Sequence, residues 1–298
     1  MRQLVKIFSV ALVAGCQFFL LADGRCDQPN PMAIEIIQPD ATWQPLLSES
    51  LDDWEPFTGV PHKSFSEPGF PPGTSDDGRT GTPVGMGDPF QIFQIEMLGG
   101  QPVLHISGRV YAGLSTKKAY QNYHLSLETR WGEKKWPPRE NQKRDSGLLV
   151  HCNGPQGAFW NVWLQSLECQ IQETDMGDFI SIAGTSAQIK CEGGREGMPN
   201  YDPSAALQPV GAGTKHWGTS RSQNFEREND WNLVEVWALG DEVVFAVNGH
   251  VVNHLNRAKV GNQDSGQPLT SGRLQLQSEA AEVFYRNIQI RGIDKIPE

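Results

Sequence analysis

Amphipathic helices and long apolar runs are what this sequence most clearly lacks. No stretch of useful length carries apolar residues at helical spacing, and no second long apolar run follows residue 22. The first absence argues against helical fold classes. The second argues against a stable membrane span, because such a span needs about 20 consecutive apolar residues.

Cysteine and positive charge are also scarce. The chain has 5 Cys among 298 residues, and no two of them have the spacing of zinc ligands. Its 25 Lys and Arg are outnumbered by 35 Asp and Glu, which gives a formal net charge of -10. This acidic balance argues against nucleic acids and anionic membranes as partners, and it suits a neutral ligand such as a sugar.

The N-terminus has the pattern of a secretory signal. Arg2 and Lys6 precede an apolar run from residue 7 to residue 22, and a polar stretch follows. We therefore assign residues 1–24 to a signal peptide and expect export to the periplasm or the extracellular space. The segment ending at Cys16 also resembles a lipobox, and lipidation of Cys16 would attach the protein to a membrane. The apolar region continues from residue 18 to residue 21, which favours simple cleavage.

Four cysteines would remain after cleavage, in a compartment where disulfides persist. They are Cys26, Cys152, Cys169 and Cys191. Cys152 and Cys169 fall on the expected core face of neighbouring strands, so they are either a cross-strand disulfide or small buried apolar residues. Spacing alone does not decide the connectivity. Neither alternative indicates a metal-binding or nucleophilic cysteine.

Turn residues and short alternating segments are abundant. The chain has 31 Gly, 20 Pro and 38% hydrophobic residues, which fits many short strands and enough apolar content for one full core. About a dozen strands predict an all-β fold, a two-sheet jelly-roll sandwich formed as a single domain by residues 40–293. Two segments rich in turn residues, 62–90 and 192–230, are expected to be long loops, and the second would be an insertion, a lid or a surface loop.

The strongest signal lies between residues 145 and 173, where polar and apolar residues alternate. Successive side chains of a strand point to opposite faces, which places Glu168, Gln170 and Gln172 together on one face. The same alternation places His151 and Trp163 on the polar face of two neighbouring strands. One face is therefore expected to be core, and the other a wet, concave surface that bears a carboxylate.

Glu168, Gln170 and Glu173 occupy positions one, three and six of this strand. A bulge after Gln172 would return Glu173 to the face of Glu168. The spacing resembles the E-x-D-x-x-E strand of sandwich-fold glucanases, whose two glutamates act as nucleophile and acid/base. Gln170 stands in the place of the aspartate, which removes one source of pKa coupling and argues against an ordinary retaining mechanism. A solvated face rich in Glu and Gln is the non-catalytic alternative.

A wider resemblance covers most of the chain. Six segments between residues 43 and 292 resemble, in order, the successive motifs of the bacterial 3-keto-disaccharide hydrolase family. They are WQPLLSESLDDW, YHLSLETRW, DSGLLVH, LECQIQE, NDWNLVEVWALGDEVVFAVNGHVVNHL and GRLQLQSEAAEVFYRNIQIRG. The resemblance implies a sandwich of the concanavalin A-like lectin/glucanase type and cleavage of glycosides already oxidised at sugar carbon three. Segment 192–230 and the SESLDDW variant depart from the family pattern, so we expect different substrate loops.

The implied reaction sets requirements for the site. A ketone at carbon three acidifies the hydrogen on carbon two, so elimination needs a base, a proton donor and a group that stabilises the enolate. We expect Glu168 to be the base, because burial among aromatic residues would raise its pKa. His151 is the candidate acid, with a hydrogen-bonded structural histidine as the alternative. Arg144 is the candidate for stabilising the enolate or binding a hydroxyl.

Other residues are expected to hold the sugar. Gln170 and Gln172 present both donors and acceptors to hydroxyl groups. Trp163 and Trp160 are candidates for stacking on sugar faces, together with Trp136, which lies in a basic loop that would cover the site.

Two further predictions concern a cation and the core. Glu173, Asp175 and Asp178 lie close together in ETDMGD and are a candidate calcium site, with an ordinary Asp/Gly turn as the alternative. Trp231 and Trp237 are expected in the core.

Three functions compete. The first is an exported hydrolase or lyase acting on 3-keto-glycosides, with Glu168 as the base. The second is a non-catalytic carbohydrate-binding sandwich, since fold does not decide function. The third is a retaining glycosidase that uses Glu168 and Glu173. The first is favoured, because the wider resemblance supports it.

Overall fold

The computed structural model describes residues 34–39 and 42–297. The predicted signal peptide, residues 1–24, lies outside this part of the chain, as do Cys16 and Cys26. Within the described ranges, no helix has the length and apolar character needed to cross a membrane.

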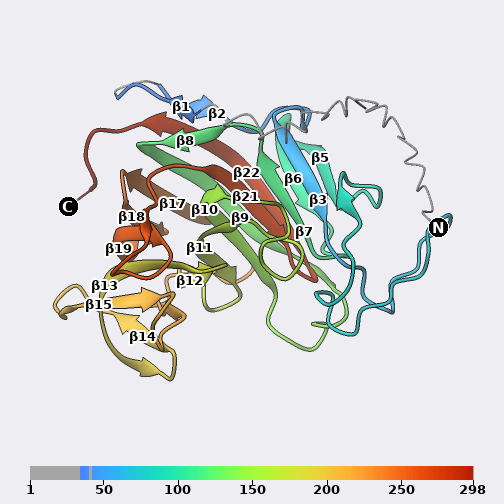
Figure 1. The fold of residues 1–298 in the computed structure, drawn as a ribbon. Helices are drawn as coiled ribbons and strands as arrows, with labels where there is room; N and C mark the ends of the chain where they lie inside the picture. Colours follow the sequence, from blue (N-terminus) through green and yellow to red (C-terminus); the bar gives the residue numbers. More distant parts are fainter. Residues whose placement is uncertain (1–33, 40–41, 298) are drawn as a thin grey trace, which may run out of the picture. The chain divides into compact units, whose positions relative to one another are not determined.

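All secondary-structure elements of the described part of the chain are β-strands, joined by turns and loops (Figure 1). They are β1 (Ile34–Ile36), β2 (Gln44–Pro45), β3 (Trp54–Thr58), β4 (Gly85–Met86), β5 (Phe93–Leu98), β6 (Gln101–Ile106), β7 (Ala112–Thr116), β8 (Ala119–Gln121), β9 (Tyr123–Lys135), β10 (Asp145–Asn153), β11 (Gln165–Gln172), β12 (Phe179–Ile182), β13 (Thr185–Arg195), β14 (Met198–Tyr201), β15 (Leu207–Gly211), β16 (Gly218–Thr219), β17 (Asn232–Leu239), β18 (Glu242–Val247), β19 (His250–Val260), β20 (Gln267–Pro268), β21 (Arg273–Ser278) and β22 (Ala281–Gly292).

Two large sheets contain nearly all of these strands. The first sheet has 8 strands in the order β16-β12-β11-β10-β21-β7-β3-β4. The second has 12 strands, with β14-β13-β19-β18-β17-β9-β22-β6-β5 as its main path. The pairings between their long strands are antiparallel, for example β10 with β11 and β9 with β22. The chain is therefore an all-β jelly-roll sandwich, as the sequence predicts.

Alternation along the strands builds the core. Leu148 on β10 and Leu167 on β11 belong to one large buried cluster, together with Leu125 on β9 and Val236 on β17. Since β9 and β17 lie in the second sheet, this cluster joins the inner faces of the two sheets. The hydroxyls of Ser146 and Tyr285 also form a hydrogen bond between the sheets, at 2.7 Å.

The cysteines do not form the cross-strand bridge that was one of two alternatives. Cys152, Cys169 and Cys191 are all buried and unbonded. A register shift in β10 between Val150 and Asn153 turns Cys152 to the outer face, whereas Cys169 packs in the main core. They are small buried apolar residues, the other alternative.

Three local predictions were wrong. Residues 162–164 form no strand, because Trp160 and Asn161 adopt positive φ angles of 53° and 58° and turn the chain. Segment 192–230 is not simply a loop, since β14, β15, β16 and the end of β13 lie in it, with β13, β14 and β15 together at one end of the sheets in Figure 1.

Trp231 and Trp237 are the third error. Val236 faces inward on β17, so the neighbouring Trp237 points outward and stacks on His124, with ring centroids 4.1 Å apart. Trp231 lies under the guanidinium of Arg286, 4.0 Å from the ring centroid. Both tryptophans are half-buried on the outer face of the second sheet.

Candidate functional site

A pocket of about 440 Å³ lies over the outer face of the first sheet. Side chains from β10, β11 and β12 form its floor, and two loops supply its aromatic walls. Its lining residues are Arg139, Asp145, Phe159, Trp160, Trp163, Glu168, Gln170, Gln172, Asp175, Asp178, Ile180, Ser181, Ile182, Arg195, Trp217 and Glu279. A concave site with a few converging polar groups and aromatic walls is typical of a ligand-binding site.

Glu168 stands on the floor of this pocket, where the alternation of β11 predicts it. Its side chain is only 3% exposed and lies over Gly147 of β10. A Cβ atom added to Gly147 would collide with Glu168 Oε1. The glycine therefore provides the space for the carboxyl group. The side chain of Gln277 on β21 lies beside it, also close to Gly147.

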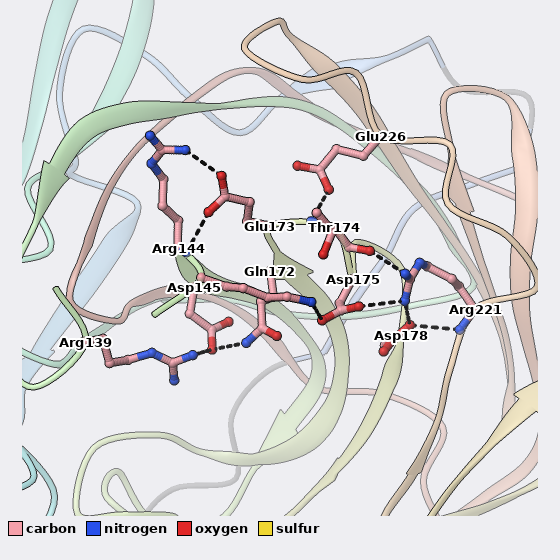
Figure 2. Close-up of polar contacts among 11 residues, drawn as sticks. Arg139, Arg144, Asp145, Gln172, Glu173, Thr174, Asp175, Asp178, Arg221 and Glu226 are labelled. Atoms are coloured by element: carbon pink, nitrogen blue, oxygen red, sulfur yellow. Dashed lines mark hydrogen bonds and ion pairs between the residues drawn. The ribbon is translucent and has the colours of Figure 1, made fainter. Parts of the chain in front are cut away.

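An ion-pair cluster adjoins Glu168. Arg139 donates from Nη1 to Glu279 Oε1 at 2.6 Å. Arg139 also pairs with Asp145, which accepts a bond from Gln172 Nε2 at 2.5 Å (Figure 2). Asp145 and Glu279 come together because their backbones pair at the end of β10 and β21. This cluster thus holds three buried carboxyl groups, those of Glu168, Asp145 and Glu279, around one guanidinium group.

Burial perturbs all three carboxyl groups. It raises the pKa of Glu168 well above its ordinary value, and the charges of Glu279 and Asp145 raise it further. It also raises the pKa of Asp145, again with the charge of Glu279 as the second cause. For Glu279 burial raises the pKa to about 7, although the Arg139 guanidinium opposes the shift. The cluster therefore retains protons near neutral pH.

This retention predicts a pH dependence of stability. The pKa of Glu279 rises from 4.5 to about 7 on folding, so the folded state binds the proton more tightly than the unfolded chain. Its contribution to stability is full below pH 4.5 and is lost as the pH rises through about 7. We expect the melting temperature to fall over this range and Glu279→Gln to flatten part of that slope. Thermal melts of both proteins across the range measure it, and identical slopes would contradict the assignment.

Several polar atoms at this end of the pocket have no protein partner. Gln170 Oε1, Asp145 Oδ1 and Arg139 Nε belong to lining residues and are buried without a hydrogen bond. Both amide atoms of Gln277, which lies close to Gly147 and does not line the pocket, are also unpartnered. Buried polar groups are normally satisfied, so an unmet group in a pocket indicates a place for water or ligand hydroxyls. Gln170 and Gln172 both line the pocket, as predicted.

His151 does not face the pocket, and its predicted place on the wet face was wrong. The bulge in β10 gives it a φ of 53° and turns its ring into the sandwich, where it meets Tyr123 edge-on at 6.0 Å. It is 0% exposed, and neither ring nitrogen has a hydrogen-bond partner. Burial lowers its pKa to about 4, so it is neutral and remote from any ligand in the pocket.

We expect His151→Leu to retain activity and to change stability by no more than about 1 kcal/mol, because the variant removes two unsatisfied buried nitrogens while keeping an apolar group of similar volume. Steady-state kinetics and thermal melts check this. A loss of activity of about 10²-fold in a folded variant would restore His151 to the reaction.

Glu173 and Arg144 also lie outside the pocket. The β10–β11 register is regular from Val150 to Asp145, so the bulge expected after Gln172 does not form. Glu173 follows the end of β11 and pairs with Arg144, Nη1 to Oε1 at 2.8 Å (Figure 2). The cation beside the buried carboxyl groups is Arg139, five residues earlier in the same basic loop.

The carboxylates of the predicted calcium site are paired with cations. Asp175 and Asp178 share Arg221, with contacts of 3.0 and 2.8 Å (Figure 2). Asp175 also pairs with Lys143 at 2.6 Å. Among the residues that the structure describes, no group of three His, Cys, Asp or Glu side chains is placed to hold a metal ion. This geometry favours an ion-paired turn.

The predicted tryptophans occupy different depths. Trp163 lines the pocket but is 1% exposed, so it offers little surface for stacking. Trp160 is more open, and the guanidinium of Arg79 lies 3.9 Å from its ring centroid. Trp136 packs against the same aromatic cluster, and its indole donates to the Ser107 carbonyl at 2.9 Å. It does not line the pocket.

Sequence reasoning missed Arg139, Asp145 and Glu279 as site residues. Asp145 was visible in the sequence as the first residue of DSG. Glu279 follows Gln275 and Gln277 of β21 at alternate positions, so its side chain points to the same outer face. The missing information was that β21 pairs with β10, which brings these residues beside Glu168.

Comparison with known proteins gives one match over most of the chain. Residues 42–291 match the model of a family described as 3-keto-alpha-glucoside-1,2-lyase-like domain. No curated protein matches the chain.

Several solved structures resemble the fold. A candidate glycosyl hydrolase from Parabacteroides distasonis is 16% identical, with 85% of this chain and 100% of that one covered and a TM-score of 0.44. A protein with a galectin-like fold from Bacillus subtilis is 10% identical, with 86% and 96% covered and a TM-score of 0.45. The carbohydrate-binding module CBM66 from Bacillus subtilis is 6% identical, with 67% and 92% covered and a TM-score of 0.40.

Proposed function

Because the chain belongs to the 3-keto-alpha-glucoside-1,2-lyase-like domain family, we propose that it cleaves 3-keto-glycosides in the pocket around Glu168. Family membership makes it a carbohydrate-active sandwich protein of a glycoside-acting family. The observation that carries the finer proposal is the group of buried carboxyls around one guanidinium on the pocket floor.

The proposed reaction is an elimination followed by addition of water. A carboxylate takes the proton from carbon two, and the C–H electron pair forms an enolate with the ketone at carbon three. The enolate then forms a double bond between carbons one and two as the glycosidic oxygen leaves carbon one and takes up a proton. Water adds to carbon one and a proton to carbon two, which completes the hydrolysis. No carboxylate nucleophile takes part.

We assign the base to Glu168. It stands in the centre of the floor and, unlike Asp145 and Glu279, has no ion pair with Arg139. Burial raises its pKa, which makes the ionised form a stronger base while reducing the ionised fraction near neutral pH. Glu279 is assigned as the proton donor, because its pKa of about 7 keeps much of it protonated at neutral pH.

Arg139 takes the role that we first gave to Arg144. Its guanidinium joins the two acidic groups, and its Nε is buried without a partner. A fixed cation of this kind stabilises negative charge that develops on the enolate oxygen. The presence of a single guanidinium also explains why the cluster retains protons. Three ionised carboxylates beside one guanidinium would leave excess negative charge in a buried site.

The experiment that tests the proposal compares methyl 3-keto-glucoside with methyl glucoside, and 3-ketotrehalose with trehalose. Turnover of the keto sugars alone supports the proposal. Turnover of the unoxidised sugars supports a conventional glycosidase, and binding of either sugar without turnover supports a lectin-like role. The conventional mechanism based on Glu168 and Glu173 lacks its second carboxylate in the pocket.

We also propose that the reaction takes place outside the cytoplasm, because residues 1–24 have the pattern of a signal peptide. Detection of the processed protein in the periplasm or medium tests this.

A further inference from the structure

The pocket floor changes character across β11. Glu168 is the direct cross-strand partner of Ile180, and Ser166 is that of Ile182, so these isoleucines continue the outer face beyond the carboxyl group. Both isoleucines line the pocket. Ile180 is half-buried and presents apolar surface to the pocket, whereas Ile182 is 1% exposed and packs beneath that surface.

Trp217 extends this apolar half to the mouth of the pocket. It is 49% exposed and lines the pocket immediately before β16, the strand next to β12. Its indole lies against Gly197, where a Cβ atom would come within 2.5 Å of Trp217 Nε1, and Arg195 lies 5.9 Å from the ring centroid. A large aromatic ring is therefore held in a defined position while much of its surface remains open to solvent.

Asp175, Asp178 and Ser181, which line this half, already have partners. Asp175 and Asp178 are paired with Arg221, as Figure 2 shows, and the Ser181 hydroxyl donates to the Thr185 carbonyl at 2.5 Å. The other half differs, because Gln170 Oε1 and Asp145 Oδ1 lack partners there. A sugar ring rich in hydroxyls fits the half with unpartnered polar atoms, and the surfaces of Ile180 and Trp217 offer dispersion contacts in the other half.

We propose that the half of the pocket formed by Ile180 and Trp217 is an aglycone subsite for an apolar, planar group. The preferred substrates are then 3-keto-glycosides of aromatic alcohols, with the keto sugar over Glu168 and the aromatic ring against Trp217. The inference rests on the proposed function, because it names the substrate class of the same pocket.

The test compares benzyl with methyl 3-keto-glucoside. Their alcohols are similar leaving groups, so the ratio of their kcat/KM values reports contacts with the aglycone. Wild type, Trp217→Ala and Trp231→Ala are compared. Trp231 is the matched control, because it is a half-buried tryptophan on the other sheet, outside the pocket. Calorimetric titration of wild type and Trp217→Ala with unoxidised benzyl and methyl glucoside gives a second readout that needs no turnover.

We expect wild type and Trp231→Ala to favour the benzyl compound about tenfold in kcat/KM and in affinity, and Trp217→Ala to bring both ratios near one. Equal values for benzyl and methyl compounds in wild type, or an unchanged preference in Trp217→Ala, would overturn the subsite. So would a kcat/KM for 3-ketotrehalose equal to that of the benzyl compound. If neither keto-glucoside is turned over, yet benzyl glucoside binds more tightly through Trp217, the proposed reaction fails and the subsite stands.

Discussion

Glu168→Gln is expected to lower kcat/KM for a 3-keto-glycoside by about 10³-fold while the protein remains folded. Glutamine fills nearly the same space over Gly147 but cannot accept a proton from carbon two. It also removes a potential negative charge beside Asp145 and Glu279, so stability should not fall. In the wild type, kcat/KM should rise with pH as Glu168 ionises, since its pKa is raised by burial, and fall again as Glu279 loses the proton that it donates.

The matched control for this variant is Glu173→Gln. Glu173 lies five residues later on the same segment, but it pairs with Arg144 and does not line the pocket. The control should keep nearly full activity. Wild-type rates from Glu168→Gln would remove Glu168 from the mechanism, and an equal loss in both variants would favour the retaining pair that the sequence first suggested.

Arg139→Met is expected to have the second largest effect, with a fall in kcat/KM of about 10² to 10³-fold. The variant removes the cation assigned to the enolate and keeps the length and apolar stem of the side chain. It also leaves Asp145 and Glu279 without their counterion, and loss of one partner of a buried ion pair costs about 3 to 5 kcal/mol when the other stays charged.

The stability loss in Arg139→Met should depend on pH. Without the guanidinium, the folded-state pKa values of Asp145 and Glu279 rise further, and stability conferred by a raised pKa is lost as the pH increases. Melting temperatures at pH about 5 and about 8 should therefore differ more in the variant than in the wild type. Arg144→Met is the control, since its pair with Glu173 lies outside the pocket. Equal effects of the two substitutions on activity would contradict the role of Arg139.

The sequence predicts the sandwich and the place of Glu168 for the same physical reason. Side chains alternate along a strand, so the apolar period of β11 decides which face is core. The same rule fails at His151, because one extra residue in β10 reverses the parity of everything after Val150. Its polar side chain gave no sign of the bulge.

The remaining site residues depend on contacts between distant parts of the chain. Glu279 is 111 positions from Glu168 in the sequence, and only the pairing of β21 with β10 brings them together. Arg139 and Arg144 lie in one basic loop, and local sequence does not indicate which of them turns toward the pocket. Trp217 was hidden in segment 192–230, where turn residues obscured short strands that place its ring at the mouth of the pocket.

The central claim is that a carboxylate on this sheet face removes the hydrogen from carbon two before the glycosidic bond breaks. Turnover of methyl 3-keto-glucoside in D₂O, followed by NMR of the released 3-keto sugar, tests it directly, with product incubated alone to measure spontaneous exchange. Solvent deuterium at carbon two, acquired faster than in that control, is the predicted result. Cleavage that leaves the original hydrogen in place would contradict the claim.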